Sequence, residues 1–357
     1  MFDIDRSYAS QVYNGMGVSF GLDDTPVLGD FRGLYVSWPD GDEWVDIFET
    51  PNAENDTLNL HAGRGNVLGM TTGADGHIYA GQYFGGGVLR IDTEARRTEL
   101  IDPDNSGLNG RKVIGLVSHP DGPVFILHDN NDPELIDILV ETDDWSDPGS
   151  WVTITRDDGL GEGTAALDVV VERADLMWFV IKGVGLVRWD VNGDGAGPGD
   201  PLTWFDKSDD RWDPPVVSFP GSQLDPRDAN SMAIGNQGTL WAGGNGLVQF
   251  TYDESTRAVD VWHSLTEKRS SSGTGLVDGN VVDITRARDG IWVATRTGLN
   301  RAVSLNEDEV EVDAWIDLRN YLGNSDYQAI DSPSVIAGLP GLTYQRIAAY
   351  ADGSQLL

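Results

Sequence analysis

The chain has 357 residues, 39% of them hydrophobic, and a formal net charge of −34 from 58 acidic and 24 basic residues. This charge argues against nucleic acids and anionic membrane surfaces as partners, because both bind basic patches. The absence of cysteine excludes disulfides, thiol catalysis and thiolate metal sites, and the apolar runs are too short for a membrane-spanning helix.

Residues 1–30 are expected to form a leader segment, and residues 31–357 a single β-propeller domain. The chain begins without a basic flank and without an apolar stretch, so we expect no secretory signal there. An alternative assigns a strand to residues 11–20, as part of an additional blade.

A sequence repeat with a spacing of roughly 45–60 residues follows. In its clearest copy, residues 280–301, an alternating strand leads into an Asp-Gly turn at 289–290. The apolar–aromatic pair Ile291-Trp292 then opens a second strand, and a Gly-Leu step at 298–299 opens a third. Related apolar–aromatic pairs occur at Ile78-Tyr79, Val124-Phe125, Met177-Trp178 and Leu240-Trp241. A tryptophan marks the fourth strand of several copies, at Trp151, Trp204, Trp262 and Trp315.

This repeat predicts the four-stranded blades of an all-β propeller. Asp-Gly supplies the positive φ that a two-residue hairpin turn requires, and a glycine at the start of the third strand lets two backbones approach closely. Four short strands per copy are typical of propeller blades. The recurring Trp178, Trp241 and Trp292 are therefore expected to pack between blades.

The two ends of the chain are expected to build one composite blade. Residues 345–357 contain a first strand, a turn and the beginning of a second strand, whereas 33–38 and 44–48 are typical of a third and a fourth strand. Such a blade would close the ring and remove its free edges. With it the count is about six blades, and seven is the alternative. A chain cut within a blade is the competing interpretation of these ends.

Residues 281–301 resemble the two-component-regulator propeller repeat. Gly-Leu loops stand where that repeat has them, at 106–110, 158–160, 275–280 and 338–340. The resemblance covers most of residues 31–357 and implies a propeller fold. It also implies a setting outside the cytoplasm, since such repeats form periplasmic sensor halves of hybrid histidine kinases, thought to bind glycans, and occur in secreted and surface proteins. The sequence itself contains no kinase or receiver region.

The most specific short motif is a glycine-rich acidic loop at 190–200. It places oxygen ligands at positions one, three and five around a glycine turn, as a Ca²⁺ loop needs. The twelfth position, where a bidentate glutamate belongs, is Pro201. The candidate calcium ligands are Asp190, Asn192, Asp194 and Asp200. The alternative is a solvated hairpin with incidental carboxylates. A second acidic loop at 129–132 is expected to be an ordinary turn.

Three explanations of the overall acidity stay open. A protein bathed in salt tolerates self-repulsion because the salt screens it, carboxylates can line cation sites, and a GC-rich genome with a solubilising surface gives the same composition.

Aromatic residues outside the repeat register are candidates for a binding face. In a propeller, the loops between second and third strands share a face with the connections between blades, and inserts enlarge those connections at 207–228 and 319–342. The candidate residues are Tyr83, Phe84, Trp212, Phe219, Tyr321 and Tyr327. For each of them, a contact that anchors its own loop is the alternative role.

No catalytic arrangement emerges from the sequence. The five histidines show no metal-ligand spacing and are expected at the surface or in turns. No nucleophile elbow or phosphate-binding loop is found, and 58 acidic residues guarantee accidental carboxylate pairs.

The sequence thus predicts a non-enzymatic, extracytoplasmic module, secreted, at the cell surface or periplasmic. It would present a loop-rich face to a protein or glycan, without nucleic acid or membrane insertion, and calcium is its one candidate cofactor. One alternative is a propeller-type polysaccharide lyase or glycosidase. Another is a structural subunit of a surface assembly stabilised by calcium.

Overall fold

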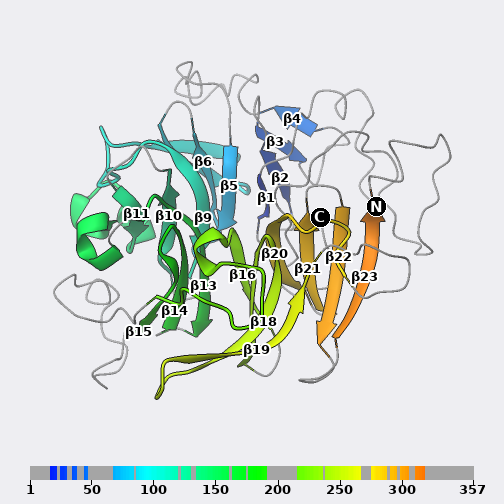
Figure 1. Cartoon of the computed structure of the whole chain (residues 1–357). Helices are drawn as coiled ribbons and strands as arrows, with labels where there is room; N and C mark the ends of the chain where they lie inside the picture. The colour runs from blue at the N-terminus through cyan, green and yellow to red at the C-terminus, as the bar shows by residue number, and fades with distance from the viewer. Residues whose placement is uncertain are drawn as a thin grey trace. The chain divides into compact units, whose positions relative to one another are not determined.

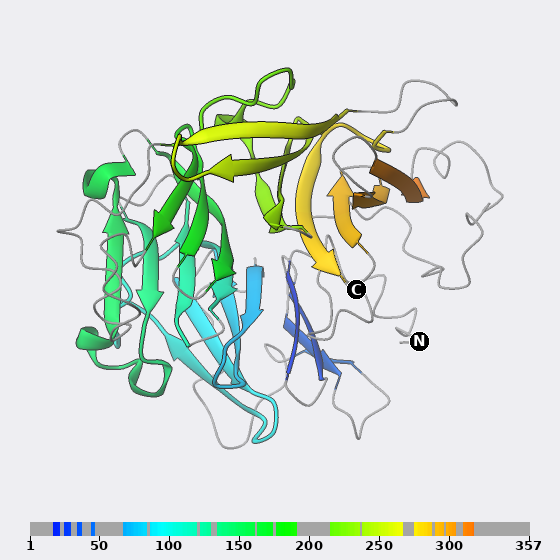
Figure 2. The same cartoon turned by 90° about the horizontal axis from the view of Figure 1, so that it is seen from below.

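The computed structural model describes residues 17–21, 25–29, 34–37, 44–46, 67–83, 86–119, 122–129, 134–160, 163–173, 176–190, 215–235, 238–266, 275–287, 290–295, 298–304 and 310–317. The chain divides into two compact units, residues 1–214 and 215–357. Each unit is described by itself below (Figures 1 and 2).

Six antiparallel sheets follow one another along the described residues, four in the first unit and two in the second. In each sheet the spatial order of the strands is their order in the chain, so hairpins join all neighbours. Such a meander is the blade of a propeller. The fold class is therefore an all-β propeller, as the repeat predicts, and the six sheets agree with the predicted six blades.

The first unit holds the sheets β1–β4, β5–β8, β9–β12 and β13–β15. Their strands are β1 Gly17–Phe20, β2 Pro26–Gly29, β3 Leu34–Ser37, β4 Trp44–Asp46, β5 Val67–Thr72, β6 Ile78–Gln82, β7 Gly87–Asp92, β8 Arg97–Ile101, β9 Val113–Ser118, β10 Val124–His128, β11 Glu134–Leu139, β12 Trp151–Thr155, β13 Ala165–Arg173, β14 Leu176–Lys182 and β15 Gly185–Asp190. Short helical turns occupy η2 Thr142–Asp144, η3 Pro148–Ser150 and η4 Arg156–Leu160.

The second unit holds the sheets β16–β19 and β20–β23, preceded by the helical turn η5 Pro226–Asp228. Their strands are β16 Ser231–Ile234, β17 Leu240–Gly244, β18 Gly246–Asp253, β19 Ala258–Leu265, β20 Val281–Ala287, β21 Gly290–Thr295, β22 Gly298–Ser304 and β23 Val310–Asp317. No helix of the described residues is long and apolar enough to cross a membrane.

The turn and packing predictions of the repeat are confirmed at Gly76, Gly87 and Trp241. Gly76 has φ +84°, as the Asp-Gly turn before β6 requires. A methyl group on Gly87 would lie 2.4 Å from the carbonyl oxygen of Ile101, so only glycine fits where β7 begins beside β8. Trp241 is 1% exposed and packs with Val281 and other apolar residues of β20 and β21, so it belongs to the core between the two sheets of the second unit.

The prediction of a composite blade is wrong for the sheet that contains β3 and β4. Both strands form as predicted, but β1 and β2 complete their sheet, and both come from residues 17–29. The register pairs Val27 with Val36, and both side chains are fully buried. The expected leader segment 1–30 therefore contributes two strands to the first sheet. Residues 345–357 lie outside the described residues.

Neighbouring sheets of the first unit pack through their first strands, β5 and β9, which lie side by side (Figure 2). A methyl group on Gly69 would lie 2.5 Å from the Cα of Gly115, so two glycines allow these backbones to touch. Farther along the same strands, the Thr71 hydroxyl donates to the Ser118 hydroxyl at 3.1 Å and accepts from the Ser118 N–H. These contacts fix how the loops of the two sheets face one another.

Candidate functional site

The predicted aromatic face is represented in the described residues by Tyr83 and Phe219. Tyr83 is half-buried in the turn between β6 and β7. Phe219 is 4% exposed, and its ring centroid lies 4.9 Å from that of Phe250 on β18. Phe219 therefore anchors its own connection to the sheet, which is the alternative role considered above, and does not present its ring for binding. The other candidates, Phe84, Trp212, Tyr321 and Tyr327, lie outside the described residues.

The predicted calcium loop is described only at its first residue. Asp190 ends β15, and its Oδ2 lies 3.5 Å from the Arg188 guanidinium. Asn192, Asp194 and Asp200 lie outside the described residues. Within the described part of the chain, no group of three or more acidic or histidine side chains is placed to hold a metal ion. The calcium site stays a prediction.

Tyr83 lies at a contact between two neighbouring sheets. It follows the last residue of β6, and Asp129 holds the same position after β10 of the next sheet. The Tyr83 hydroxyl donates to Asp129 Oδ2 at 2.6 Å, and the Asp129 N–H donates to the carbonyl of Lys112 at 3.2 Å. The Lys112 ammonium lies 6.0 Å from the centre of the Tyr83 ring, at the limit of a cation–π contact.

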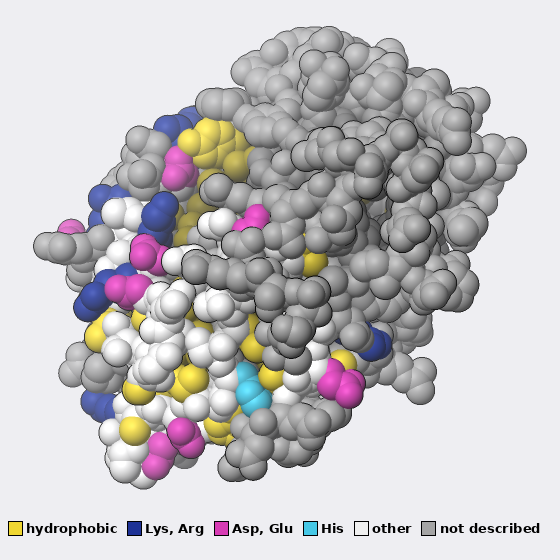
Figure 3. Space-filling model, turned by 45° about the vertical axis from the view of Figure 1, so that its right-hand side comes forward, with side chains coloured by type: hydrophobic (Ala, Val, Ile, Leu, Met, Phe, Trp, Pro, Cys, Tyr) yellow, Lys and Arg dark blue, Asp and Glu magenta, His cyan; other side chains and the backbone are white. Residues whose placement is uncertain are grey.

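Arg111 extends this arrangement over the β6–β7 turn. A methyl group on Gly86 would lie 3.5 Å from both Cβ and Nη1 of Arg111, so the arginine side chain lies beside Gly86. Its Nη2 lies 3.2 Å from Asp104 Oδ1, in an ion pair whose side chains are 53% and 80% exposed. We call Tyr83, Arg111, Lys112 and Asp129 the Tyr83 cluster. Acidic and basic side chains also lie next to each other elsewhere on the described surface (Figure 3).

A buried carboxylate holds the loop that carries Arg111 and Lys112. Asp137 on β11 is fully buried, and its Oδ2 accepts hydrogen bonds from the N–H groups of Asn109 and Gly110, both at 2.9 Å. Oδ2 also lies 3.0 Å from His128 Nε2, and Oδ1 accepts from the Thr153 hydroxyl. Burial opposes the charge, but the hydrogen bonds outweigh it and lower the pKa of Asp137. The carboxylate is therefore ionised and fixes the loop 106–110.

Gly110 and His128 are fitted to one another beneath this loop. A methyl group on Gly110 would lie 2.5 Å from two atoms of the His128 ring, so no larger residue fits there. The expectation that the histidines lie at the surface or in turns is wrong for His128, which is 0% exposed. In the second unit, a neutral amide holds a loop in the way that Asp137 does. The Oδ1 of Asn300 on β22 accepts a hydrogen bond from the Val277 N–H at 3.0 Å.

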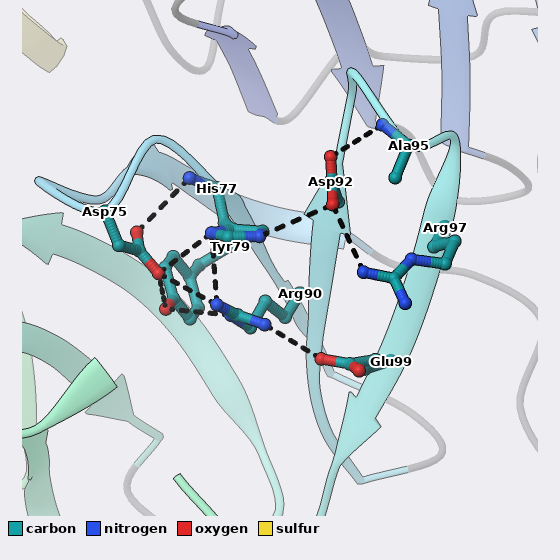
Figure 4. Close-up of polar contacts among 8 residues, drawn as sticks. All are labelled: Asp75, His77, Tyr79, Arg90, Asp92, Ala95, Arg97 and Glu99. Carbon is teal, nitrogen blue, oxygen red and sulfur yellow. Dashed lines mark hydrogen bonds and ion pairs between the residues drawn. The ribbon is translucent and has the colours of Figure 1, made fainter. Parts of the chain in front are cut away.

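A second polar cluster lies in the sheet β5–β8, centred on Asp75, Tyr79 and Arg90 (Figure 4). Asp75 Oδ2 accepts from the Tyr79 hydroxyl at 2.9 Å and from Arg90 at 3.2 Å, and Arg90 also pairs with Glu99 at 2.9 Å. His77 Nδ1 lies 3.0 Å from Asp75 Oδ2. Burial, reinforced by the negative charge of Asp75, raises the pKa of Tyr79 far above its ordinary range.

In this cluster, the Tyr79 hydroxyl and the Arg90 guanidinium both donate to the same carboxylate oxygen of Asp75. Burial opposes the charge of Arg90, but its contacts with Tyr79, Glu99 and Asp75 outweigh burial and raise its pKa. A phenol that stays protonated and a guanidinium that stays charged are poor proton carriers at neutral pH. The cluster therefore ties the β5–β6 turn to β7 and β8.

Sequence reasoning found Tyr83 but missed its partners. Tyr83 and Asp129 are 46 residues apart and meet only because two sheets stack in register. Asp137 does leave a signal, because it is the one charged residue in the apolar run from Leu135 to Leu139 of β11. A lone carboxylate in such a strand must find donors when it is buried.

Comparisons with known proteins support the propeller fold, but they do not assign a function. No family model matches the sequence, and no curated protein does. Solved structures do match. The extracellular domain of the putative hybrid two component system BT3049 from B. thetaiotaomicron matches with a TM-score of 0.57 and 12% identity, over 95% of this chain and 37% of that one. PorZ, a bacterial surface component of the type-IX secretion system of Porphyromonas gingivalis, matches with a TM-score of 0.53 and 13% identity, over 81% and 39%. A streptogramin B lyase matches with a TM-score of 0.52 and 12% identity, over 84% and 82%.

Proposed function

We propose that this propeller is an extracytoplasmic interaction module that binds a protein or glycan partner through the face of its first unit that carries the Tyr83 cluster. The observation that carries the proposal is the preorganisation of this cluster. The Tyr83 hydroxyl is bonded to Asp129, the Lys112 ammonium lies 6.0 Å from the centre of the Tyr83 ring, and Arg111 lies beside Gly86.

Preorganisation matters because binding has to order the side chains that make the contact, at about 0.5–1.5 kcal/mol for each flexible side chain. Tyrosine and arginine are also the residue types that contribute most to binding at protein interfaces. The buried Asp137 extends this order into the backbone, because it fixes the two amides that precede Arg111. A partner would therefore meet a surface already in its binding geometry.

The setting outside the cytoplasm is supported by the names of two similar structures, one an extracellular domain and the other a bacterial surface component. The chain spans only 37% and 39% of those two chains. Signalling and secretion are therefore activities of longer proteins, and we carry over only a propeller at the cell surface.

Binding of labelled chain to the surface of cells of the encoding organism tests the proposal. Wild-type chain should bind saturably, and Tyr83→Ser should weaken binding by about tenfold, the loss expected from roughly 1.4 kcal/mol. The matched control is Arg257→Ser, a change at an exposed turn residue of the second unit. Equal binding by wild type and both variants would overturn the assignment of the site.

A lyase is the second candidate, because the streptogramin B lyase resembles this chain over 82% of its own length. A screen of polysaccharides and cyclic lactones for turnover separates the two functions. The interaction module predicts no turnover of any substrate. The lyase would be established instead if the chain turned over a substrate and one substitution in the first strand of a sheet abolished that turnover.

A further inference from the structure

We infer that Asn109 is a latent site of spontaneous covalent modification, at which the asparagine converts to isoaspartate when the loop 106–110 leaves Asp137. The inference goes beyond the proposed function and is independent of it, because it concerns the chemistry of the loop and not what the propeller binds.

The sequence supplies a reactive pair of residues at this loop. Asn-Gly occurs four times in the chain, at 14–15, 109–110, 192–193 and 245–246. In this dipeptide the backbone nitrogen of glycine can attack the side-chain carbonyl carbon of asparagine, because glycine has no Cβ to obstruct the approach. In the folded chain Asn109 is exposed to water, whereas Gly110 is buried. The electrophile is therefore at the surface and the nucleophile is not.

The reaction balances with water as its one co-reactant. The bond from Gly110 N to Asn109 Cγ forms and the bond from Cγ to Nδ2 breaks. Ammonia leaves with the proton of the Gly110 amide, and a cyclic succinimide remains. Water then opens this ring at either carbonyl and yields isoaspartate or aspartate at position 109.

Hydrogen bonds in the folded chain oppose this reaction at both reacting groups. The Gly110 N–H donates to Asp137 Oδ2 at 2.9 Å. Because that carboxylate is ionised, loss of the amide proton would place two negative charges side by side. Asn109 Nδ2 donates to the Thr153 hydroxyl oxygen at 2.6 Å and to the Gly107 carbonyl at 3.2 Å. The leaving group is therefore held in place while the nucleophile keeps its proton.

Packing also restricts the nucleophile. A methyl group on Gly110 would lie 2.5 Å from two atoms of the His128 ring, which is fully buried. The Gly110 backbone therefore lies directly against the ring and cannot shift toward it. The reaction requires the loop to open, and its rate is the rate in an unfolded chain multiplied by the fraction of time that the loop is open.

Conversion would prevent the loop from closing again. In isoaspartate the chain runs through the former side chain, so an additional carbon separates the amide of residue 109 from the amide of residue 110. These are the two amides that Asp137 Oδ2 binds, and they would lose the spacing that lets both donate to it. The new α-carboxylate would also add a negative charge beside Asp137. The modified loop is therefore expected to stay open.

Peptide mapping of the full chain by mass spectrometry, after incubation at mildly alkaline pH, tests the inference. Isoaspartate at position 109 should form at least about tenfold more slowly in folded wild type than in chain unfolded in guanidinium. Asp137→Ala should raise the rate in the folded chain by about tenfold. Thr153→Val keeps the carboxylate and removes one acceptor of the Asn109 side chain, so it should raise the rate by about fivefold, the effect of one hydrogen bond.

Asn245 is the internal control for loss of stability in the whole chain. It lies in the second unit, and the N–H of its neighbour Gly246 donates to the Gly279 carbonyl at 2.7 Å. Neither Asp137→Ala nor Thr153→Val should change the rate of conversion at Asn245 in the folded chain.

Three results would overturn the inference. One is an equal rate at Asn109 in folded and unfolded wild type, and another is the absence of isoaspartate at this position in the unfolded chain. The third is equal acceleration at Asn109 and Asn245 in Asp137→Ala. Circular dichroism shows whether each variant is folded. If Asp137→Ala is not, Thr153→Val decides, and an unchanged rate at Asn109 in that variant would contradict the inference.

Discussion

Removing the buried carboxylate of Asp137 should cost the chain about 3–5 kcal/mol of folding free energy. Asp137→Ala deletes the acceptor of the Asn109 and Gly110 N–H groups and of the Thr153 hydroxyl, and it leaves His128 Nε2 without its partner. A buried donor that loses its acceptor costs about 1–3 kcal/mol. Several such donors lose their acceptor together, and the sum stays at about 3–5 kcal/mol because the loop can relax toward water.

The assay is urea denaturation of the full chain, followed by tryptophan fluorescence, with Asn300→Ala as the comparison. Asn300 Oδ1 accepts the Val277 N–H at 3.0 Å, and loss of this acceptor should cost about 1–2 kcal/mol. The reasoning is refuted if Asp137→Ala costs no more than Asn300→Ala, since a charged acceptor of several donors would then be equivalent to a neutral amide acceptor.

The pH dependence of a second variant, Asp137→Asn, tests whether the carboxylate of Asp137 is ionised in the folded chain. The pKa of Asp137 is lowered in the folded chain relative to about 3.9 in an unfolded one. Its contribution to stability is therefore complete above pH 3.9 and is lost as the pH falls through the folded value. The difference in unfolding free energy between wild type and Asp137→Asn should shrink below about pH 4. A difference that stays constant down to pH 2 would contradict an ionised Asp137.

Four further changes test other parts of the account. Gln249→Leu should be neutral or stabilise by about 1 kcal/mol in urea, because the buried amide has no hydrogen-bond partner among the described residues; a loss of 2 kcal/mol or more would reveal a partner. Gly110→Ala should lower stability by about 2 kcal/mol, since its methyl group would overlap the His128 ring, and an unchanged Tm would show that the ring can move. Arg257→Gly should raise stability by up to about 1 kcal/mol, because Arg257 has φ +55°; a lower Tm would mean that its side chain contributes more than its backbone strain costs. Calcium at low concentration should raise Tm by mass action, and Asp190→Ala should remove that rise. A response only to molar NaCl would point to general screening.

The blades were predictable because each carries its own local markers. An Asp-Gly turn, an apolar–aromatic pair and a glycine at the third strand are readable within about 20 residues, and Gly76, Trp241 and Gly87 do in the structure what these markers imply. The strands β1 and β2 were not assigned to the first blade because Pro26–Gly29 has neither the turn nor the aromatic pair.

The candidate site was predictable only in part, because it depends on contacts between sheets. Tyr83 could be singled out as an aromatic residue beside a turn, but its bond to Asp129 requires the stacking register of two blades. The same limit applies to Phe219, whose burial against Phe250 depends on how a long connection folds back onto its sheet. Neither the Tyr83–Asp129 contact nor the Phe219–Phe250 contact can be predicted from composition or periodicity.

Site-specific photo-crosslinking at position 83 tests the central claim most directly. A photoreactive phenylalanine analogue replaces Tyr83 in one chain and Arg257 in the other, and both chains are irradiated on cells of the encoding organism. If the Tyr83 cluster is the binding face, position 83 should give one discrete adduct that excess wild-type chain suppresses, and position 257 should give none. Equal adducts at both positions, or an adduct at 257 alone, would contradict the assignment of this face.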